Sequence, residues 1–371
     1  PTTITSYRSA MPSSSLRRAK NPSIGRDEPR HGTGTTATVA RFEPKVIQIA
    51  FITFPSRLVC MVRDMTGQPS VDVRTVSWFL ALAFGISWGG VTLLRLLGVD
   101  LGSSAGQGIG TVVFMGAPAV AAIAVLRVRR ASVRKGCGLY LGRARWIVLA
   151  WLAPVGLTAV MIGVGLTLPG TTLTTEYSAF LLELGATETE AAETVAELEA
   201  TGVSPGVTLG GLALVLGATL FALAALGEEL GWRGFLLTKL APLGFWKVSL
   251  VTGLVWGIWH TPLILLGLQF SAAPAIGLLL MPTATVALSP TYTYFTVRAR
   301  SVLAATFFHG SFVFGTFTSV YLAGGDELVV SSFGVVGIVA ALLSVAVCVA
   351  HDRLLAEEQI TTGGSLRPWA G

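Results

Sequence analysis

Apolar residues in this chain gather in long runs that short polar segments separate. From Val76 onward, each run approaches the ~20 residues with which a helix crosses the hydrocarbon core of a membrane. The eight runs are 76–97, 108–126, 146–168, 207–231, 247–268, 272–295, 302–323 and 329–349. In the sixth run, Pro274, Pro282 and Pro290 predict a kinked or broken helix. We therefore predict an all-α fold, a polytopic transmembrane bundle of about eight helices.

The segments on either side of these runs define two further regions. Residues 1–41 are rich in Ser, Thr, Arg and Pro and lack helical or strand periodicity, which is typical of disorder. The apolar stretch at 46–55 is too short to span a membrane. We predict a disordered or cytosolic N-terminal extension over 1–75, the transmembrane bundle over 76–350 and a short cytosolic tail over 351–371.

Composition agrees with residence in a membrane. Hydrophobic residues make up 52% of the 371 residues and charged residues only 12%, about half of the charged fraction that is usual in soluble domains. The net charge of +6 does not indicate nucleic-acid binding, because Lys and Arg lie in short clusters between apolar runs without an RNA-binding or zinc-finger pattern. We expect membrane lipid as a partner and no nucleic acid.

The positive residues also predict the orientation of the chain. If the N-terminus is cytosolic, 25 of the 26 Lys and Arg residues lie in cytosolic segments. The exception is Arg95, near the outer end of the first run, where a long side chain can reach the interface. Because cytosolic loops carry the excess of Lys and Arg, we predict a multi-pass protein of the cell membrane with both termini in the cytosol.

Small residues four positions apart occur in three of the runs. Such pairs let helix backbones approach closely, so they predict tight packing and indicate no particular function. The pairs are Gly85 and Gly89, Gly227 and Gly231, and Gly253 and Gly257.

Apart from Arg95 and Lys247 near the ends of their runs, the charged and histidine side chains within the apolar runs are Glu228, Glu229, His260 and His309. Counted from Lys239, Lys247 and Arg300 at the cytosolic ends of their runs, Glu228 is 11 residues deep, His260 is 13 and His309 is 9. With a helix rise of ~1.5 Å per residue, these depths are roughly 17, 20 and 13 Å. Three helices thus bring one Glu and two His to a shared layer that is open to the cytosol. Ionisable residues in a membrane span indicate a functional site, although a helix-end salt bridge and hydrogen-bonded core histidines would also explain them.

Glu228, His260 and His309 are residue types that can hydrolyse a peptide bond. A carboxylate can act as a general base toward water, one imidazole can share that water, and a second can donate to the oxyanion. One Glu and two His are also a zinc ligand set that leaves a position for water, so the three are candidate ligands of a divalent metal such as zinc. Glu229 and Arg233 are spaced i and i+4 in the favourable order for a structural ion pair. This pair leaves Glu228 as the reactive carboxylate.

Three motifs carry a resemblance to a known family. Residues 228–234, Glu-Glu-Leu-Gly-Trp-Arg-Gly, follow the pattern EExxxR. Trp256 lies four positions before His260, and Phe308 and His309 open a later helix. In order and spacing, these motifs resemble those of the CAAX protease and bacteriocin-processing (CPBP) family, the Rce1/Abi-type intramembrane metalloproteases. The resemblance covers roughly residues 207–320.

The resemblance implies a peptidase that cleaves near the C-terminus of a peptide or protein substrate or removes a leader segment. It implies that Glu228 and His260 activate the water and that His309 helps to hold the oxyanion. The family commonly has Asn or Asp four residues after the last His, where this chain has Val313. The loss of one oxyanion donor typically lowers the rate ~100-fold or more. We interpret the chain as an intramembrane endopeptidase, resembling CAAX prenyl proteases, that acts near the cytosolic side of the bilayer.

Two other functions fit parts of the same pattern. Val313 favours a non-catalytic membrane scaffold or regulator on the same fold. A transporter would use the buried charges as an ion relay, and the Pro-containing sixth run would suit a broken helix. Against transport, the two halves of the chain show no inverted repeat.

Overall fold

The computed structural model describes residues 71–174, 176–183, 186–315 and 321–369. The predicted N-terminal extension over 1–75 lies outside the described residues except for its last five positions. The unit that contains the described residues runs from Phe42 to Gly371.

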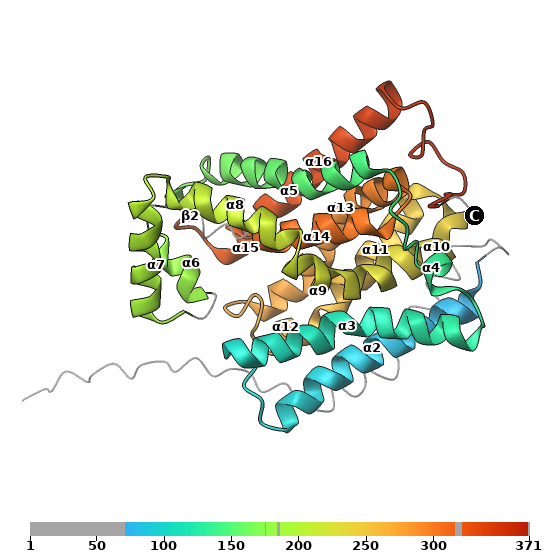
Figure 1. The fold of residues 1–371 in the computed structure, drawn as a ribbon, viewed down its shortest axis with the longest axis horizontal. Coiled ribbons are helices and arrows are strands. Elements are labelled where there is room, and N and C mark those ends of the chain that lie inside the picture. The colour runs from blue at the N-terminus through green and yellow to red at the C-terminus, as the bar shows by residue number, and fades with distance from the viewer. Residues whose placement is uncertain (1–70, 175, 184–185, 316–320, 370–371) are drawn as a thin grey trace, which may run out of the picture. The chain divides into compact units, whose positions relative to one another are not determined.

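Helices make up nearly all of the regular structure in the described residues (Figure 1). Two short strands, β1 and β2, pair antiparallel, with Thr172 opposite Ala323. In chain order the elements are α2 (Val73–Leu96), α3 (Ser104–Val128), α4 (Val133–Gly136), α5 (Ala144–Gly165), β1 (Thr172–Leu173), α6 (Ser178–Glu183), α7 (Glu188–Ala200), α8 (Pro205–Gly217), α9 (Leu220–Glu229), the π-helix η1 (Leu230–Leu236), α10 (Leu237–Leu240), the 3-10 helix η2 (Ala241–Leu243), α11 (Phe245–Trp259), α12 (Thr261–Leu265), α13 (Pro274–Ala299), α14 (Val302–Gly315), β2 (Leu322–Ala323), α15 (Glu327–Val330) and α16 (Val335–Leu354).

Six helical segments of the described chain are long and apolar enough to cross a membrane, and a seventh span arises if the bent pair α7 and α8 is counted as one. The axes of that pair differ by 101°. The six segments are Val73–Leu96, Ala105–Val128, Ala144–Gly165, Phe245–Leu265, Pro274–Ala299 and Glu327–Leu354. The predicted all-α, multi-pass membrane fold is therefore confirmed.

Two of the eight predicted spans are interrupted. The run 207–231 divides into α8 and α9, because the backbone leaves helical geometry at Thr219 (φ −121°, ψ −93°). The run 302–323 holds α14, which has 14 residues and ends at Gly315, followed beyond an undescribed gap by strand β2. Apolar composition alone cannot place these breaks, since each run is apolar on both sides of its break.

Helix α13 is continuous from Pro274 to Ala299 although Pro282 and Pro290 lie inside it, so the sixth span is not broken. The neighbouring helix α11 lies directly against it. A Cβ on Gly257 of α11 would come within 2.4 Å of the Cα of Pro282. This support from a packed neighbour is the means by which membrane helices tolerate proline.

Close backbone contacts also set the positions of α9, η1 and α3. A Cβ on Gly227 would lie 2.7 Å from the carbonyl oxygen of Met115, and one on Gly231 would lie 2.4 Å from Pro118. The predicted tight packing holds for these residues and for Gly253 and Gly257, but Gly85 and Gly89 of α2 face open space. The motif-bearing helix is thus pressed against α3.

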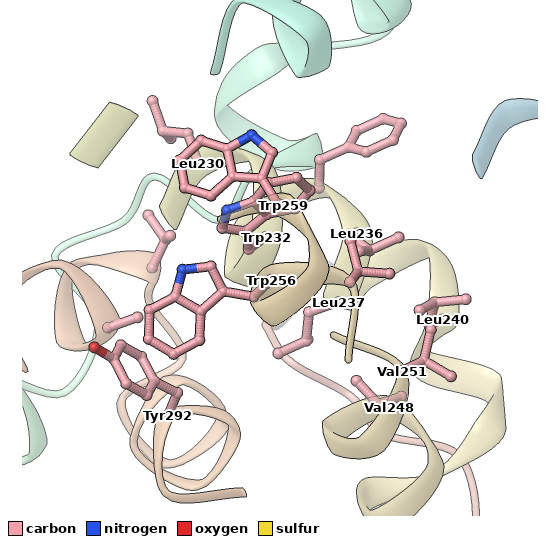
Figure 2. Close-up of a cluster of buried hydrophobic side chains, with 14 of the residues drawn as sticks. Leu230, Trp232, Leu236, Leu237, Leu240, Val248, Val251, Trp256, Trp259 and Tyr292 are labelled. Carbon is pink, nitrogen blue, oxygen red and sulfur yellow. The ribbon is translucent and has the colours of Figure 1, made fainter. Parts of the chain in front are cut away.

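Three buried tryptophans lie at the centre of the large apolar cluster (Figure 2). Trp232 and Trp259 are inaccessible to solvent, and Trp256 is 1% exposed. Trp259 donates its indole N–H to the hydroxyl of Ser87 on α2 at 2.7 Å, and its backbone carbonyl accepts from the indole of Trp88 at 3.0 Å. These bonds fix the end of α11, where the motif histidine follows, to α2.

Candidate active site

The two glutamates of the EExxxR motif end helix α9, and the π-helix η1 begins at the next residue. Single π-helical segments within α-helices occur frequently at functional sites, because the wider turn changes which side chains share a face. Glu228 is 3% exposed, and Glu229 and Arg233 are fully buried. The motif therefore points into the bundle and not into lipid.

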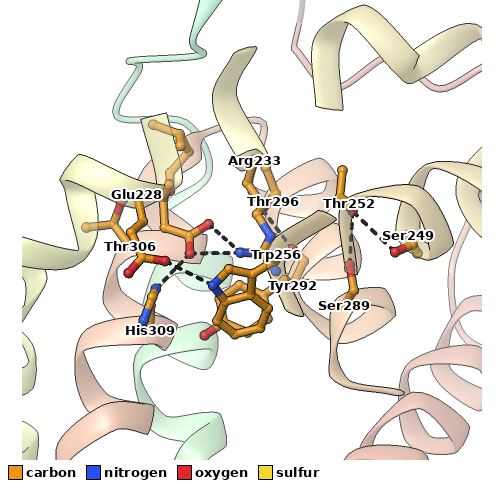
Figure 3. A network of polar contacts seen from close by, with 12 residues as sticks. Glu228, Arg233, Ser249, Thr252, Trp256, Ser289, Tyr292, Thr296, Thr306 and His309 are labelled. Atoms are coloured by element: carbon orange, nitrogen blue, oxygen red, sulfur yellow. Dashed lines mark hydrogen bonds and ion pairs between the residues drawn. The ribbon is translucent and has the colours of Figure 1, made fainter. Parts of the chain in front are cut away.

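Glu229 connects two other residues of the predicted site, Arg233 and His309, which are labelled in Figure 3. Its carboxylate accepts two hydrogen bonds from Nη1 of Arg233, at 3.0 and 3.2 Å. It also lies 2.7 Å from Nδ1 of His309 on α14. Because a carboxylate accepts hydrogen bonds, Nδ1 of His309 carries the proton in this arrangement. The structure thus has the predicted Glu229–Arg233 pair, and it adds a bond that orients the His309 ring.

The guanidinium group of Arg233 lies between two aromatic rings. Its central carbon is 4.5 Å from the ring centre of Trp256 and 4.1 Å from that of Tyr292 on α13. Such cation–π contacts are strongest where water is excluded. Nε and Nη2 of Arg233 and the hydroxyl of Tyr292 are buried without a hydrogen-bond partner in the described residues. The site therefore has several buried polar atoms that remain available to a bound molecule.

Glu228 is held by a different contact. The indole Nε1 of Trp256 donates to Oε2 of Glu228 at 3.0 Å. Trp256 comes from α11, so this bond joins the motif helix to the helix that ends at the second motif. The other carboxylate oxygen, Oε1, has no hydrogen-bond donor in the described residues. It is the oxygen that can accept a proton from water.

His260 forms the C-terminal cap of α11 and is 7% exposed. Its Nδ1 lies 2.8 Å from the backbone carbonyl of Trp256, and since a carbonyl only accepts, Nδ1 carries the hydrogen. The rings of His260 and His309 each lie 5.7 Å from the ring of Trp256. Both histidines thus adjoin one tryptophan, and Nε2 of His260 remains for another partner.

Glu228, Glu229 and His309 place their donor atoms within 4.8 Å of one another, and all three residues are buried. Carboxylate oxygen and imidazole nitrogen are both ligand types of zinc, and catalytic zinc sites have three protein ligands with a further position for water. The residues therefore fit a divalent metal. Two of the sequence candidates, Glu228 and His309, belong to this cluster, which includes Glu229 in place of His260.

The sequence reasoning missed two parts of the site. Trp256 served to recognise the second motif, and the bond from its N–H to Glu228 was not predicted. Tyr292 was not considered, because its contact with Arg233 depends on how α13 is rotated about its axis. An aromatic residue one helical turn before a motif histidine is the signal that could have revealed Trp256. Nothing in the sequence around Tyr292 distinguishes it from a core residue.

Val313 belongs to helix α14, but its side chain lies outside what the structure describes. Two positions earlier, the hydroxyl of Ser311 is buried without a partner in the described residues. A Cβ on Gly217 would lie 2.7 Å from that hydroxyl oxygen. The replacement of the family's Asn or Asp by Val313 is therefore known from the sequence alone.

Comparison with known proteins agrees with this geometry. The family model Rce1-like, described as type II CAAX prenyl endopeptidase Rce1-like, matches residues 210–315. No curated protein matches the chain. The matched segment extends from α8 to α14 and includes Glu228, Glu229, Arg233, His260 and His309. The resemblance seen in the three motifs is therefore confirmed: residues 210–315 match the Rce1-like domain of the CPBP family, which implies a peptidase.

Proposed function

We propose that this protein is an intramembrane endopeptidase in which Glu228 activates a water molecule to hydrolyse a peptide bond near the cytosolic side of the membrane. One observation carries the proposal. Glu228, Glu229 and His309, from two helices of the matched domain, form a buried cluster with closely spaced donor atoms. Buried ionisable groups at this depth are costly and occur where function requires them.

The attacking water takes its place beside Glu228. The bond from Trp256 Nε1 fixes one carboxylate oxygen, and the free oxygen accepts a proton as the water oxygen attacks the peptide carbonyl carbon. The resulting tetrahedral oxyanion collapses, the C–N bond breaks, and Glu228 returns the proton to the leaving amine. Proton transfer by one positioned carboxylate typically contributes ~100- to 10,000-fold to a rate.

The two histidines have separate tasks in this proposal. Because Nδ1 of His260 donates to the carbonyl of Trp256, Nε2 of the neutral ring accepts a hydrogen bond from the same water. His309 is oriented by Glu229, in the way that a carboxylate orients the histidine of a hydrolytic triad. When protonated, its Nε2 donates to the oxyanion. Arg233 holds Glu229 from the other side.

A divalent metal such as zinc is the cofactor that we propose for this site. Glu228, Glu229 and His309 would hold it. A bound zinc ion supplies a Lewis acid that polarises a carbonyl oxygen and activates bound water. If it is present, Glu228 and His309 would act as its ligands instead of as base and oxyanion donor, and His260 would lie outside the ligand set as the partner of the water.

Substrate and orientation follow from the membrane position. The substrate class is a peptide or protein that reaches the site from the cytosolic face, as the family name suggests. Lys and Arg cluster at the chain segments that follow the site helices at this face, and such clusters favour the cytosol. We propose residence in the cell membrane with both termini cytosolic.

The test is peptide cleavage by the full chain in liposomes. A panel of peptides that carry C-terminal or leader segments is incubated in heavy-oxygen water, and fragments are identified by mass spectrometry. We expect paired fragments, with heavy oxygen in the new carboxyl group, from the wild type and none from Glu228→Ala. The matched control is Glu197→Ala, which removes an exposed glutamate of α7 and should leave cleavage unchanged.

A chelator arm tests the metal. Loss of cleavage on chelation, with recovery on zinc addition, supports the cofactor, and full cleavage under chelation excludes it. Equal fragment yields from the wild type and Glu228→Ala would refute the assignment of the base. If neither protein cleaves any peptide of the panel, the non-catalytic scaffold becomes the better account of the fold.

A further inference from the structure

Two adjoining cavities lie at the ends of α5, α13 and α16. The first has a volume of about 770 Å³ and is lined in part by residues 358–369 of the C-terminal segment. The second, about 710 Å³, runs along α5 and α16. They share Arg143, Arg298 and Glu358. None of the catalytic candidates described above lines either cavity, so the cavities form a separate site.

Arginine dominates the charged lining. Five arginines and two glutamates line the two cavities: Arg143, Arg145, Arg298, Arg300, Arg367, Glu357 and Glu358. The side chains of Arg143 and Arg145 are exposed and form no ion pair in the described residues. Glu358 is 4.0 Å from Arg300 and largely exposed, and surface pairs of this kind contribute little. The lining of the two cavities therefore carries a net positive charge that its glutamates do not neutralise.

Arg298 adds a buried donor to this group. It is 7% exposed and bonds to Asp352 of α16, while its Nε is buried without a partner in the described residues. Asp352 in turn accepts from the backbone amides of Ile360 and Thr361, at 3.1 and 2.9 Å. These bonds fold the C-terminal segment over the arginines. The site thus has a built wall, and Arg298 forms part of the lining of both cavities.

The second cavity continues from the arginines onto apolar surface. Leu149 and Leu152 of α5 and Val347 of α16 line it, and each of these side chains is exposed. Gly156, further along α5, would have nothing within 4 Å of an added Cβ. Trp146 lies at the junction between the charged and the apolar parts, which is the level where tryptophan is enriched in membrane proteins. The groove therefore has a cationic end and an open apolar length.

We propose that this site binds an anionic phospholipid. Arg143, Arg145 and Arg298 hold the phosphate, and one acyl chain lies in the groove between α5 and α16. Basic pockets between transmembrane helices at the cytosolic side attract anionic headgroups, and these arginines lie at ends that the charge distribution assigns to the cytosol. A zwitterionic headgroup lacks the net charge to match them.

Native mass spectrometry of the full chain in detergent tests the proposal. The protein is presented with phosphatidylglycerol, phosphatidylcholine or glycerol 3-phosphate, and retention of each is compared. We expect preferential retention of phosphatidylglycerol, and no competition from glycerol 3-phosphate because it lacks the acyl chain. Arg143→Gln with Arg145→Gln should lower that retention by about fivefold per arginine, which corresponds to about 1 kcal/mol for each basic residue near an anionic headgroup.

A matched pair of substitutions separates the site from general surface charge. Arg127→Gln with Arg130→Gln removes the same charge from the end of α3, and neither residue lines the cavities. This variant should retain phosphatidylglycerol as the wild type does. Gly156→Phe fills the groove without altering the arginines and should also release the lipid. Thermal unfolding establishes that each variant is folded.

Three results would overturn the proposal. Equal retention of phosphatidylglycerol and phosphatidylcholine would show that the arginines do not select charge. Equal losses in the two double variants would assign the effect to overall charge. Competition by glycerol 3-phosphate would identify a site for soluble phosphates instead of a lipid site.

Discussion

Replacing Arg233 with Met removes one partner of the buried ion pair with Glu229. Arg233 is inaccessible to solvent, donates two hydrogen bonds to Glu229 and lies between the rings of Trp256 and Tyr292. Met keeps most of the volume, and its thioether packs well against aromatic rings. The substitution therefore removes charge and hydrogen bonds with little loss of packing.

The expected cost follows from the burial of both partners. Breaking a buried ion pair by removing one partner typically destabilises a protein by ~3–5 kcal/mol, because the other charge remains buried and uncompensated. His309 still donates to Glu229 in the variant, so we expect a value near ~3 kcal/mol. Glu229→Gln alone should cost a similar amount, since it leaves the guanidinium group without a charge partner.

The double variant Glu229→Gln with Arg233→Met gives the decisive comparison. Its amide oxygen still accepts from His309, and neither charge of the Glu229–Arg233 pair is left without the other. We expect its stability to lie within ~1 kcal/mol of the wild type, because replacement of a whole buried pair is often neutral. With single costs of ~3 kcal/mol each, the coupling energy is then at least ~5 kcal/mol. The assay is reversible unfolding in mixed micelles. Additive costs in the double variant, or single variants as stable as the wild type, would refute the reasoning.

Three further predictions follow from individual contacts. Gly310→Ala places a Cβ 2.2 Å from the carbonyl oxygen of Gly217, and this overpacking should cost ~1–3 kcal/mol in micellar unfolding. Trp256→Phe keeps an aromatic ring at this position but removes the indole N–H that donates to Glu228. Hydrogen bonds to charged groups contribute ~1.5–3 kcal/mol, so peptide cleavage should slow while the protein remains folded. Asp72→Ala removes the N-terminal cap of α2 and should cost ~1 kcal/mol at neutral pH. Hydrogen bonds from the first turn of α2 hold the pKa of Asp72 below its usual 3.8, so this cost should be present above pH 3.8 and disappear as pH falls through the folded-state pKa.

Each of these predictions has its own control. Gly163→Ala in α5 meets nothing within 4 Å and should be neutral or slightly stabilising, since Ala favours helix over Gly. If Gly310→Ala is as stable as the wild type, α14 and α8 can move apart at no energetic cost, which contradicts the predicted overpacking. Wild-type cleavage by Trp256→Phe would show that the indole bond does not position the base. For Asp72→Ala, an effect that persists at acid pH would point to lost packing instead of the cap.

The sequence predicted the helical membrane fold because lipid imposes a strong and simple constraint on length and polarity. It also predicted the Glu229–Arg233 pair, since residues four apart on a helix face each other. Both features are local to one helix. The break at Thr219 was not predicted. It adjoins the close approach of Gly217 to Gly310, a contact between separate segments that the pattern of one run does not show.

The remaining parts of the site depend on how helices rotate and pack against one another. Glu229 and His309 are 80 positions apart, and depth alone does not show which faces of their helices meet. The π-helix after Glu229 has no sequence signature, yet it changes the direction of the side chains that follow. For this reason Glu229 was predicted as a purely structural residue, whereas the structure places it beside His309.

The rate of peptide hydrolysis by Glu228→Gln, compared with the wild type in the same liposomes, tests the central claim most directly. Gln keeps the size of the side chain and an oxygen that can accept from Trp256, so the unfolding midpoint should match that of the wild type. The account predicts a rate on the order of 100- to 10,000-fold lower, the contribution of a general base. A variant that is equally stable and hydrolyses the peptide at the wild-type rate would contradict it.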